Sequence, residues 1–295
     1  MSAYYIIYID FKSTKYQKIT KLGKGGFGTV YLVLNKKDNK SYAMKEFSIE
    51  NETKEKIDFI EKEAIFLSKF ESKYIVKYYD CEKVNNKFYI LMEYCDGTNL
   101  ENFIKEYREK NELISQEILY KIIKQICLGI RAIHSKNIIH RDLKPENIFM
   151  NSKKEIKIGD FGISKQLDSY KKYTMTVNKA GTQYYISPEI IGKGIYNYKT
   201  DIYSLGCIIY ELFTLRKYYL DKLTDEIKDI DETIYGPRWK NVIKSSLIPD
   251  YNKRPDINQI YEFILGDNYE ILGILDNKNI IEKNYDEIMS KKNQY

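Results

Sequence analysis

Runs of apolar and aromatic residues in the first part of the chain have the length and composition of β-strands. Four such runs are rich in Tyr, Val, Ile and Phe: 16–22, 29–34, 41–47 and 88–94. Short runs of this kind, separated by polar stretches, are typical of strands. The polar segment NKKDNK at 35–40 predicts a hairpin turn between two of them.

Helical spacing of apolar residues occurs once among the strands and dominates after residue 95. Residues 52–69 carry one apolar stripe: Ile57, Ile60, Ala64 and Leu67. A second stripe begins at Leu100, and a longer one runs through about 115–135. Residues 200–213 are apolar on most faces, which predicts a buried helix. The pattern therefore predicts a small strand-rich lobe joined near 94–96 to a larger helical lobe, with a ligand cleft between them.

Composition and charge narrow the class of protein. The 295 residues are 43% hydrophobic and 31% charged, and the net charge of +6 is spread along the chain, which is unlike a dedicated nucleic-acid binder. The four cysteines lie far apart and there are two histidines, so neither a zinc site nor a disulfide framework is expected. Reduced thiols fit the cytoplasm, with the nucleus as an alternative. The absence of a membrane-length apolar run predicts no membrane association.

A glycine-rich segment, LGKGGFGTV at 22–30, lies between two predicted strands. Gly23, Gly25 and Gly28 fit the spacing G-x-G-x-x-G. A dinucleotide-binding turn would open a helix at the third glycine, which this position does not favour. A glycine-rich turn between strands instead lets backbone amides approach phosphate groups. A simple turn is the alternative.

Lys45 ends a buried-type strand segment and needs a partner for its charge. One interpretation is a solvated lysine at a strand edge. The other is a cation that contacts phosphate and is held by a carboxylate from the helix at 52–69. Glu63 is the first candidate for this carboxylate, and Glu61 is the alternative.

Two further motifs are HRDLKPEN at 140–147 and DFG at 160–162. With the glycine segment and Lys45, they resemble the signature set of eukaryotic protein kinases of the serine/threonine type, in its usual order. The resemblance covers roughly 16–264. It implies an α+β, bilobal protein kinase fold: a small lobe with a five-stranded antiparallel sheet and one helix, and a larger, mainly α-helical lobe. The implied divisions are an N-terminal extension, the two lobes and a C-terminal tail: 1–15, 16–94, 95–264 and 265–295.

The resemblance assigns chemical roles in phosphoryl transfer from ATP. Asp142 would be the catalytic base for the substrate hydroxyl, and Lys144 would offset charge on the transferred phosphate. Asn147 and Asp160 would hold Mg²⁺, with Mn²⁺ as an alternative, because a hard cation takes oxygen ligands. Lys45, paired with Glu63, would hold the α- and β-phosphates of ATP.

Further positions match the ATP site of the family. The glycine segment would cover the phosphates with Leu22, Gly23, Lys24, Gly25, Gly26, Phe27 and Gly28. Apolar side chains would sandwich the adenine ring: Val30, Ala43 and Phe149. Met92, Glu93 and Cys95 match the hinge, where backbone groups of Glu93 and Cys95 would bond the adenine edge.

Other matches are structural. Asp201 resembles the aspartate that fixes the backbone of the catalytic segment. Glu189 and Arg254 resemble a buried ion pair in the helical lobe. His140 is interpreted as a packing residue and not as a general base.

The resemblance extends to substrate class and subfamily. Lys144 and Thr182 match serine/threonine kinases, and Thr182 would dock the protein substrate near Asp142. Glu146 suggests a basic residue N-terminal to the target hydroxyl. GTQYYISPE at 181–189 is similar to NIMA-related kinases, while GKGGFG is similar to the kinases of translation initiation factor 2 alpha. The alternative from another class is a pseudokinase scaffold that binds nucleotide or protein partners without phosphotransfer.

The segment before Thr182 raises a question of activation. Asn178 occupies the position where many such kinases carry a phosphorylated threonine that pairs with the residue matching Arg141. Thr176, or secondarily Thr174, is the predicted replacement phosphosite. An upstream kinase, or self-association for autophosphorylation, would then be a partner.

Overall fold

The computed structural model describes residues 8–11, 14–25, 28–68, 70–161, 182–218 and 237–265. The chain divides into two compact units, with the change from the first to the second after Gly97. Each unit is described separately below. The predicted division of the whole chain into extension, lobes and tail stays a prediction.

The first unit is built on one antiparallel sheet with the strand order β1-β2-β3-β4-β6-β5. Its elements are β1 (Tyr8–Phe11), β2 (Thr14–Gly25), β3 (Gly28–Asn35), β4 (Lys40–Ser48), α1 (Lys54–Ser68), β5 (Tyr78–Val84) and β6 (Lys87–Glu93). The expected five strands are β2 to β6. A sixth strand, β1, adds to the sheet edge next to β2 from residues assigned to the N-terminal extension.

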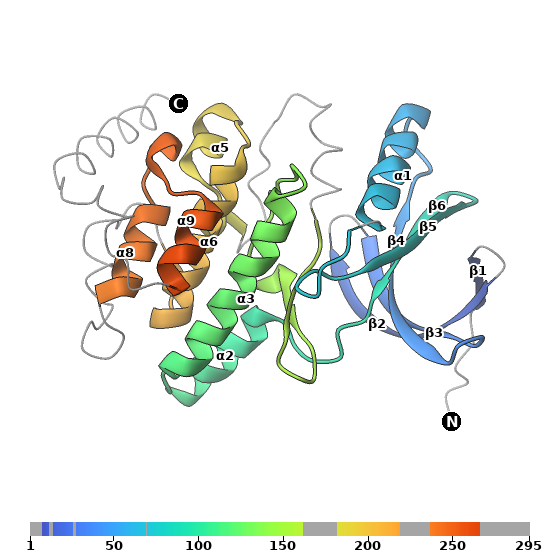
Figure 1. The fold of residues 1–295 in the computed structure, drawn as a ribbon. Coiled ribbons are helices and arrows are strands. Elements are labelled where there is room, and N and C mark those ends of the chain that lie inside the picture. Colours follow the sequence, from blue (N-terminus) through green and yellow to red (C-terminus); the bar gives the residue numbers. More distant parts are fainter. Residues whose placement is uncertain are drawn as a thin grey trace. The chain divides into compact units, whose positions relative to one another are not determined.

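Helix α1 covers the part of the sheet that contains β5 (Figure 1). The predicted apolar stripe is its buried face: Ile57, Ile60, Ala64 and Leu67. Burial of each large aliphatic side chain contributes about 1.5–3 kcal/mol, so this stripe accounts for the docking of α1. The predicted helix at 52–69 is therefore confirmed.

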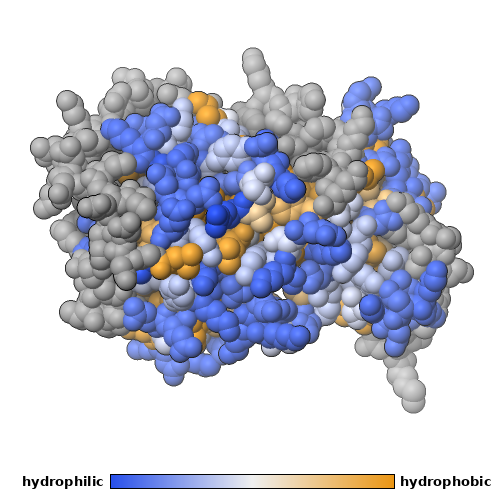
Figure 2. Space-filling view, in the orientation of Figure 1, coloured by the Kyte–Doolittle hydropathy of each residue, from blue (hydrophilic) through white to orange (hydrophobic). Residues whose placement is uncertain are grey.

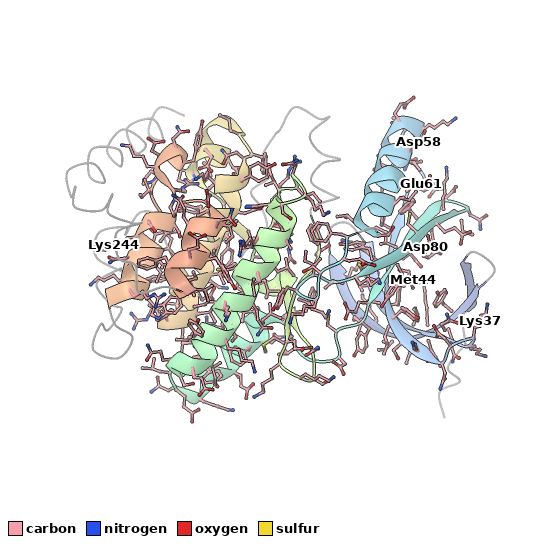
Figure 3. All side chains as sticks on the ribbon, viewed as in Figure 1. Lys37, Met44, Asp58, Glu61, Asp80 and Lys244 are labelled. Atoms are coloured by element: carbon pink, nitrogen blue, oxygen red, sulfur yellow. The ribbon has the colours of Figure 1, made fainter. Side chains whose placement is uncertain are left out.

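A second apolar cluster stabilises the same sheet. It consists of Tyr16, Val33, Met44, Tyr89 and Leu91. Met44 lies within the sheet (Figure 3) and has no exposed surface. Successive residues of a strand point to opposite faces of the sheet. Because Val33 and Met44 are buried on one face, the residues next to them in β3 and β4 point to the other face.

The second unit is mainly helical. Its elements are α2 (Leu100–Lys110), α3 (Gln116–His134), η1 (Pro145–Asn147), β7 (Ile148–Met150), β8 (Ile156–Ile158), η2 (Thr182–Tyr185), α5 (Pro188–Lys193), α6 (Tyr198–Thr214), α8 (Pro237–Ser246), η5 (Tyr251–Lys253) and α9 (Ile257–Leu265). Polar side chains cap the longer helices. Ser115 accepts a hydrogen bond from the Ile118 N–H at the start of α3, and Asn197 forms a capping box with Thr200 at the start of α6.

Helix α6 is the centre of the second unit. It packs against α3 and α8, and α9 packs against α3 (Figure 1). Every residue from Thr200 to Phe213 is buried, as the all-round apolar pattern predicts. The exceptions to that pattern are two buried carboxylates, Asp201 and Glu211. Buried charges require strong partners, and both carboxylates have them: Asp201 accepts backbone N–H groups, and Glu211 contacts Arg108 and Lys217.

The described surface is mixed. Figure 2 shows hydrophilic residues over most of the visible described surface, with smaller hydrophobic areas between them. Large exposed apolar side chains come from different elements, such as Ile19 in β2, Ile65 in α1 and Leu113 after α2. Among the described residues, no helix has the length and hydropathy needed to cross a membrane.

Candidate active site

The segment between α3 and β7 brings the predicted catalytic residues together. The Lys144 Nζ lies 3.1 Å from the Asp142 Oδ2. The Asn147 side-chain nitrogen donates to the Asp142 carbonyl at 2.7 Å and to its Oδ2 at 3.2 Å. One carboxylate is therefore held between an ammonium and an amide. This arrangement fixes the position of the Asp142 side chain.

Asp201 holds the start of this segment from α6. Its Oδ2 accepts the His140 N–H at 2.8 Å, and its Oδ1 accepts the Arg141 N–H at 3.0 Å. The expected role of Asp201 is therefore confirmed. The same Oδ2 lies 2.8 Å from the His134 Nε2, which sequence reasoning did not assign.

Arg141 has a strained backbone. Its φ of 69° lies in the left-handed region, which is costly for a residue with a long side chain. The bond from its N–H to Asp201 supports that conformation, so the turn into Asp142 depends on a residue of α6.

His140 is a buried positioning residue. Its Nε2 donates to the Gly159 carbonyl at 3.0 Å, and its Nδ1 accepts the Asp142 N–H at 3.3 Å, which describes the neutral ring. Burial lowers the pKa of His140, although Asp201 and Asp142 act in the opposite direction. Its ring centroid lies 5.0 Å from that of Phe161. The packing interpretation is confirmed.

Asn147 and the residue before Asp160 are joined through the backbone. The Gly159 N–H donates to the Asn147 carbonyl at 2.9 Å. Asp160 follows with a φ of 53° and an exposed side chain. Because the Asn147 nitrogen bonds Asp142, its side-chain oxygen is the atom suited to a cation.

This donor set fits a magnesium ion bound to phosphate. A carboxylate and an amide oxygen are hard ligands, and Mg²⁺ commonly takes only one or two protein groups and completes its shell with phosphate oxygens and water. Within the described residues, no group of three or more His, Cys, Asp and Glu side chains could hold a metal by itself.

Strand register places the predicted nucleotide residues of the first unit on one face of the sheet. Val30 pairs with Lys45, and Ala43 pairs with Met92. Paired residues of antiparallel strands point to the same side, so the Lys45 ammonium and these three apolar side chains share a face. The sheet thus offers one cation beside an apolar surface.

The glycine segment is partly described. Gly23 pairs with Val30, Lys24 with Thr29, and Gly25 with Gly28. The side chains of Leu22 and Lys24 are exposed. Gly26 and Phe27 lie outside the described residues.

Gly28 is required by close backbone approach. Its φ is +146°, and an added Cβ would lie 2.3 Å from the Glu46 carbonyl oxygen. A residue with a side chain fits neither the backbone conformation nor this space. At Gly23 an added Cβ would meet nothing within 4 Å. The third glycine of the motif is therefore needed for structure, and the first is not.

The proposed carboxylate partner of Lys45 stays a prediction. Glu63 belongs to α1, but its side chain lies outside the described part of the structure. Glu61, the alternative, has an exposed side chain on the same helix (Figure 3).

The hinge candidates lie at the end of β6, with Met92 and Glu93 in the strand and Cys95 two residues after it. The Glu93 N–H donates to the Lys77 carbonyl at 2.8 Å, so a bond from Glu93 to an adenine edge would use its carbonyl oxygen. Cys95 is half-buried. Phe149 lies in β7 of the second unit. Because the adenine candidates come from both units, their grouping into one pocket stays a prediction.

The expected buried ion pair of the helical unit is confirmed. Arg254 Nη1 and Nη2 each lie 2.8 Å from a carboxylate oxygen of Glu189, and both residues are buried. The Arg254 Nε donates to the Ile248 carbonyl at 2.6 Å. This bidentate pair, with its remaining donors satisfied, joins α5 to the segment before α9.

Sequence reasoning missed a charged network around Glu211. It contains Glu101, Arg108, Tyr185, Glu211 and Lys217. These residues lie up to 116 positions apart, and no motif links them. The only signal in the sequence is a glutamate within an otherwise apolar helix.

The substrate-docking and phosphosite candidates are only partly visible. Thr182 begins η2, but its side chain lies outside the described residues. Thr174, Thr176 and Asn178 also lie outside them.

Comparison of the sequence with known proteins identifies the family to which the chain belongs. The family model of the protein kinase domain matches residues 16–265, and the chain belongs to the protein kinase family. It is 34% identical over 265 residues to a probable serine/threonine-protein kinase, nek2, of Dictyostelium discoideum. That match covers 85% of this chain and 63% of the relative.

Two further relatives carry Nek names. The probable serine/threonine-protein kinase nek3 of Dictyostelium discoideum is 38% identical over 88% of this chain and 24% of the relative. Serine/threonine-protein kinase Nek5 of Homo sapiens is 39% identical over 68% of this chain and 28% of the relative. The predicted similarity to NIMA-related serine/threonine kinases is confirmed, and the chain spans less than two thirds of the length of each of these relatives.

Proposed function

We propose that this protein is an ATP-dependent serine/threonine protein kinase that transfers the γ-phosphate of ATP to Ser and Thr hydroxyls of protein substrates. Family membership supports this proposal. The observation that carries it is the catalytic segment, where Lys144 lies 3.1 Å from Asp142 and Asn147 holds the same carboxylate.

Each residue of this segment has a role in the proposed reaction. The Asp142 carboxylate orients the substrate hydroxyl and accepts its proton, and Lys144 offsets the charge of the transferred phosphate. Asn147 and Asp160 supply oxygen ligands for Mg²⁺, or Mn²⁺, which neutralises phosphate charge when bound with ATP. Lys45, the glycine segment and the apolar face with Val30, Ala43 and Met92 bind the nucleotide.

A pseudokinase scaffold is the competing function. Loss of Lys45, Asp142, Asn147 or Asp160 would favour it, but all four residues are present. The contacts around Asp142 support the enzyme instead, because a protein that only binds nucleotide needs no base held in this way.

The test is transfer of labelled phosphate from ATP to a generic protein substrate by the full chain. We expect Asp142→Asn to lower kcat by at least about 10²-fold, because the base is lost while the fold is kept. Asp58→Asn, an exposed change on α1 (Figure 3), is the matched control and should leave the rate unchanged. No transfer by the wild-type protein, with nucleotide binding retained, would support the scaffold.

The proposal includes the partners and the cellular location of the protein. The partners are protein substrates, with no nucleic acid and no membrane. The location is the cytoplasm, or alternatively the nucleus, and it is supported by four free cysteines.

Activation by phosphorylation is part of the proposal. Within the described residues, the buried Nε of Arg141 has no hydrogen-bond partner, and its guanidinium stacks 5.4 Å from the Tyr196 ring. A phosphate on Thr176, or secondarily Thr174, would satisfy this donor. An upstream kinase or a second copy of this chain would add it. Full activity of a Thr174→Ala, Thr176→Ala double variant would reject these two sites.

A further inference from the structure

Lys217 is the centre of a partly buried charge cluster in the second unit. The other members are Glu101 and Arg108 from α2, Tyr185 from η2 and Glu211 from α6. We refer to these five residues as the Lys217 cluster. They bring together the helix that follows Gly97, the segment that begins at Thr182, and the central helix of the unit.

The ammonium of Lys217 has three partners. Its Nζ lies 2.6 Å from the Glu101 Oε2, 2.9 Å from the Glu211 Oε1 and 2.7 Å from the Tyr185 hydroxyl oxygen. An ammonium has three donors, so the group is saturated. Burial acts against its charge, but the bond to Glu101 and the attraction to Glu211 raise the pKa of Lys217. Lys217 is therefore a fixed cation.

The buried carboxylate of Glu211 depends on this cation. Glu211 has no exposed surface, and it also contacts the Arg108 Nη2 at 3.2 Å. The Tyr185 hydroxyl donates to its second oxygen. The cluster therefore contains two carboxylates, Glu101 and Glu211, and two cations, Arg108 and Lys217. Its charges balance without an external group.

Helix α2, which carries Glu101 and Arg108 of the cluster, packs against η1, which carries Glu146 of the catalytic segment. Burial raises the pKa of Glu146, whereas the charges of Lys144 and Lys217 lower it and that of Glu101 raises it. The Glu146 Oε2 is buried and has no hydrogen-bond partner among the described residues. Lys217, bonded to Glu101 of α2, therefore places positive charge beside the element that carries Glu146, and Glu146 is the residue that predicts a basic side chain in the substrate.

We propose that Lys217 is a specificity-determining residue that occupies the place of a substrate cation. It compensates Glu101 and Glu211 next to η1, the element that carries Glu146. The chain consequently selects weakly, or not at all, for a basic residue N-terminal to the phosphoacceptor, which revises the expectation based on Glu146. This inference rests on the proposed kinase function, because it concerns the substrate of that reaction.

The experiment uses pairs of peptides that contain one phosphoacceptor serine. The two peptides of a pair differ at a single position N-terminal to that serine, which is Arg in one and Gln in the other. Separate pairs test the successive N-terminal positions. For the wild-type full chain, kcat/KM of the Arg peptide should stay within about threefold of that of its Gln partner. Lys217→Met should raise this ratio about tenfold at one position or more, because Glu101 then lacks its cation, Glu211 keeps only Arg108 and Tyr185, and the excess negative charge can accept charge-assisted bonds from arginine. If Lys217 had only a structural role, its loss would lower kcat/KM for both peptides of a pair equally. The ratio of the two values would then stay unchanged.

Three further variants make the result specific. Lys217→Arg keeps the cation and should keep the wild-type ratio. Lys253→Met removes a half-exposed lysine, 3.9 Å from Asp250, and should also leave the ratio unchanged. Lys217→Gln keeps a polar side chain for Tyr185 and replaces the methionine variant if that protein does not fold.

The outcomes separate this inference from the proposed function. A wild-type preference for Arg of tenfold or more, or a rise below threefold in the folded Lys217 variant, would overturn the inference. Equilibrium binding of the same peptides, labelled with a fluorophore, gives the ratio without catalysis. If the wild-type protein transfers no phosphate but the binding ratio rises in the variant, the proposed function fails and the inference about Lys217 stands.

Discussion

The catalytic segment of the second unit and strands β2 to β4 of the first unit carry different parts of the proposed chemistry, and different interactions hold their backbones. In the segment at 140–147, side chains from distant elements bond the main chain, as Asp201 does at His140 and Arg141. In the sheet, the main chain bonds its neighbour strands in a regular register, from Thr29 opposite Glu46 to Asn35 opposite Lys40.

This difference predicts different sensitivities. A segment held by a few charged side chains is vulnerable to loss of a single acceptor, even one far away in sequence. A strand held by many backbone bonds tolerates side-chain changes, except where two backbones come unusually close. The predictions below test this contrast in order of decreasing effect.

The largest expected effect is on stability, at the buried pair of the second unit. Arg254→Met would leave the Glu189 carboxylate buried and unpaired, which should lower the free energy of unfolding by about 3–5 kcal/mol. Urea unfolding measures this change. The adjacent Lys253→Met removes only a half-exposed pair with a separation of 3.9 Å and should cost less than about 1 kcal/mol. Equal effects of the two changes would contradict the assignment of a buried, fully bonded arginine.

The second effect is on catalysis, through Asp201. Asp201→Asn replaces one acceptor oxygen by a donor, so either the His140 or the Arg141 N–H loses its partner. The turn into Asp142 should shift, and kcat for phosphotransfer should fall about 10²-fold, with a smaller change in KM for ATP. Steady-state kinetics with ATP as the varied substrate provide the measurement. A kcat within threefold of wild type would show that the segment keeps its geometry without Asp201.

The third effect tests the sheet. Gly28→Ala would place a Cβ against the Glu46 carbonyl and require a backbone conformation that alanine rarely adopts. We expect a loss of about 1–3 kcal/mol in the free energy of unfolding and weaker binding of ATP. Gly23→Ala is the control, because its Cβ meets no neighbour, and it should change stability by less than about 0.5 kcal/mol. A destabilised Gly23→Ala would show that the first glycine is equally constrained.

The smallest effect concerns pH. Burial lowers the pKa of His140 in the folded protein, so the unfolded chain binds more protons near and below pH 6.5. The contribution of His140 to stability is therefore complete above about pH 6.5 and is lost as the pH falls below it, with a slope of at most about 1.4 kcal/mol per pH unit.

Comparison of wild type with His140→Phe isolates this contribution. Urea unfolding at about pH 7.5 and about pH 5.5 should show a smaller drop in stability for the variant, which has no group to protonate at this position. His134 is unchanged in both proteins. An equal drop in the two would mean that His140 does not titrate differently on folding.

Resemblance to a family identified most of the catalytic segment, because its residues form one contiguous motif, HRDLKPEN. Asp142, Lys144 and Asn147 occupy one turn-rich stretch, and local geometry brings them into contact. The remote anchor Asp201 and the pair of Glu189 with Arg254 were found only by resemblance to a family. Spacing alone carries no information about partners more than sixty positions apart.

Other features could not be foreseen from the pattern. Strand β1 consists of four residues, Tyr8–Phe11, and depends on an open sheet edge for its formation. The contact of His134 with Asp201 and the Lys217 cluster depend on how α2, α3 and α6 pack. The preference for a basic residue that Glu146 suggests stays a prediction, and no pattern in the sequence indicates that Lys217 bonds Glu101 and Glu211.

The sequence by itself determined the elements, the family motifs and the identity of the proposed catalytic groups. The elements follow from local periodicity, whereas the motifs and the catalytic groups were assigned because contiguous stretches of the chain resemble a family. Only the tertiary structure decided which charges are compensated, that Gly28 lies against Glu46, and that Lys217 satisfies Glu101, Glu211 and Tyr185 together. The physical reason is that the free energy of a buried charge depends on the groups that packing brings within hydrogen-bond distance, and packing joins residues without regard to their separation in sequence.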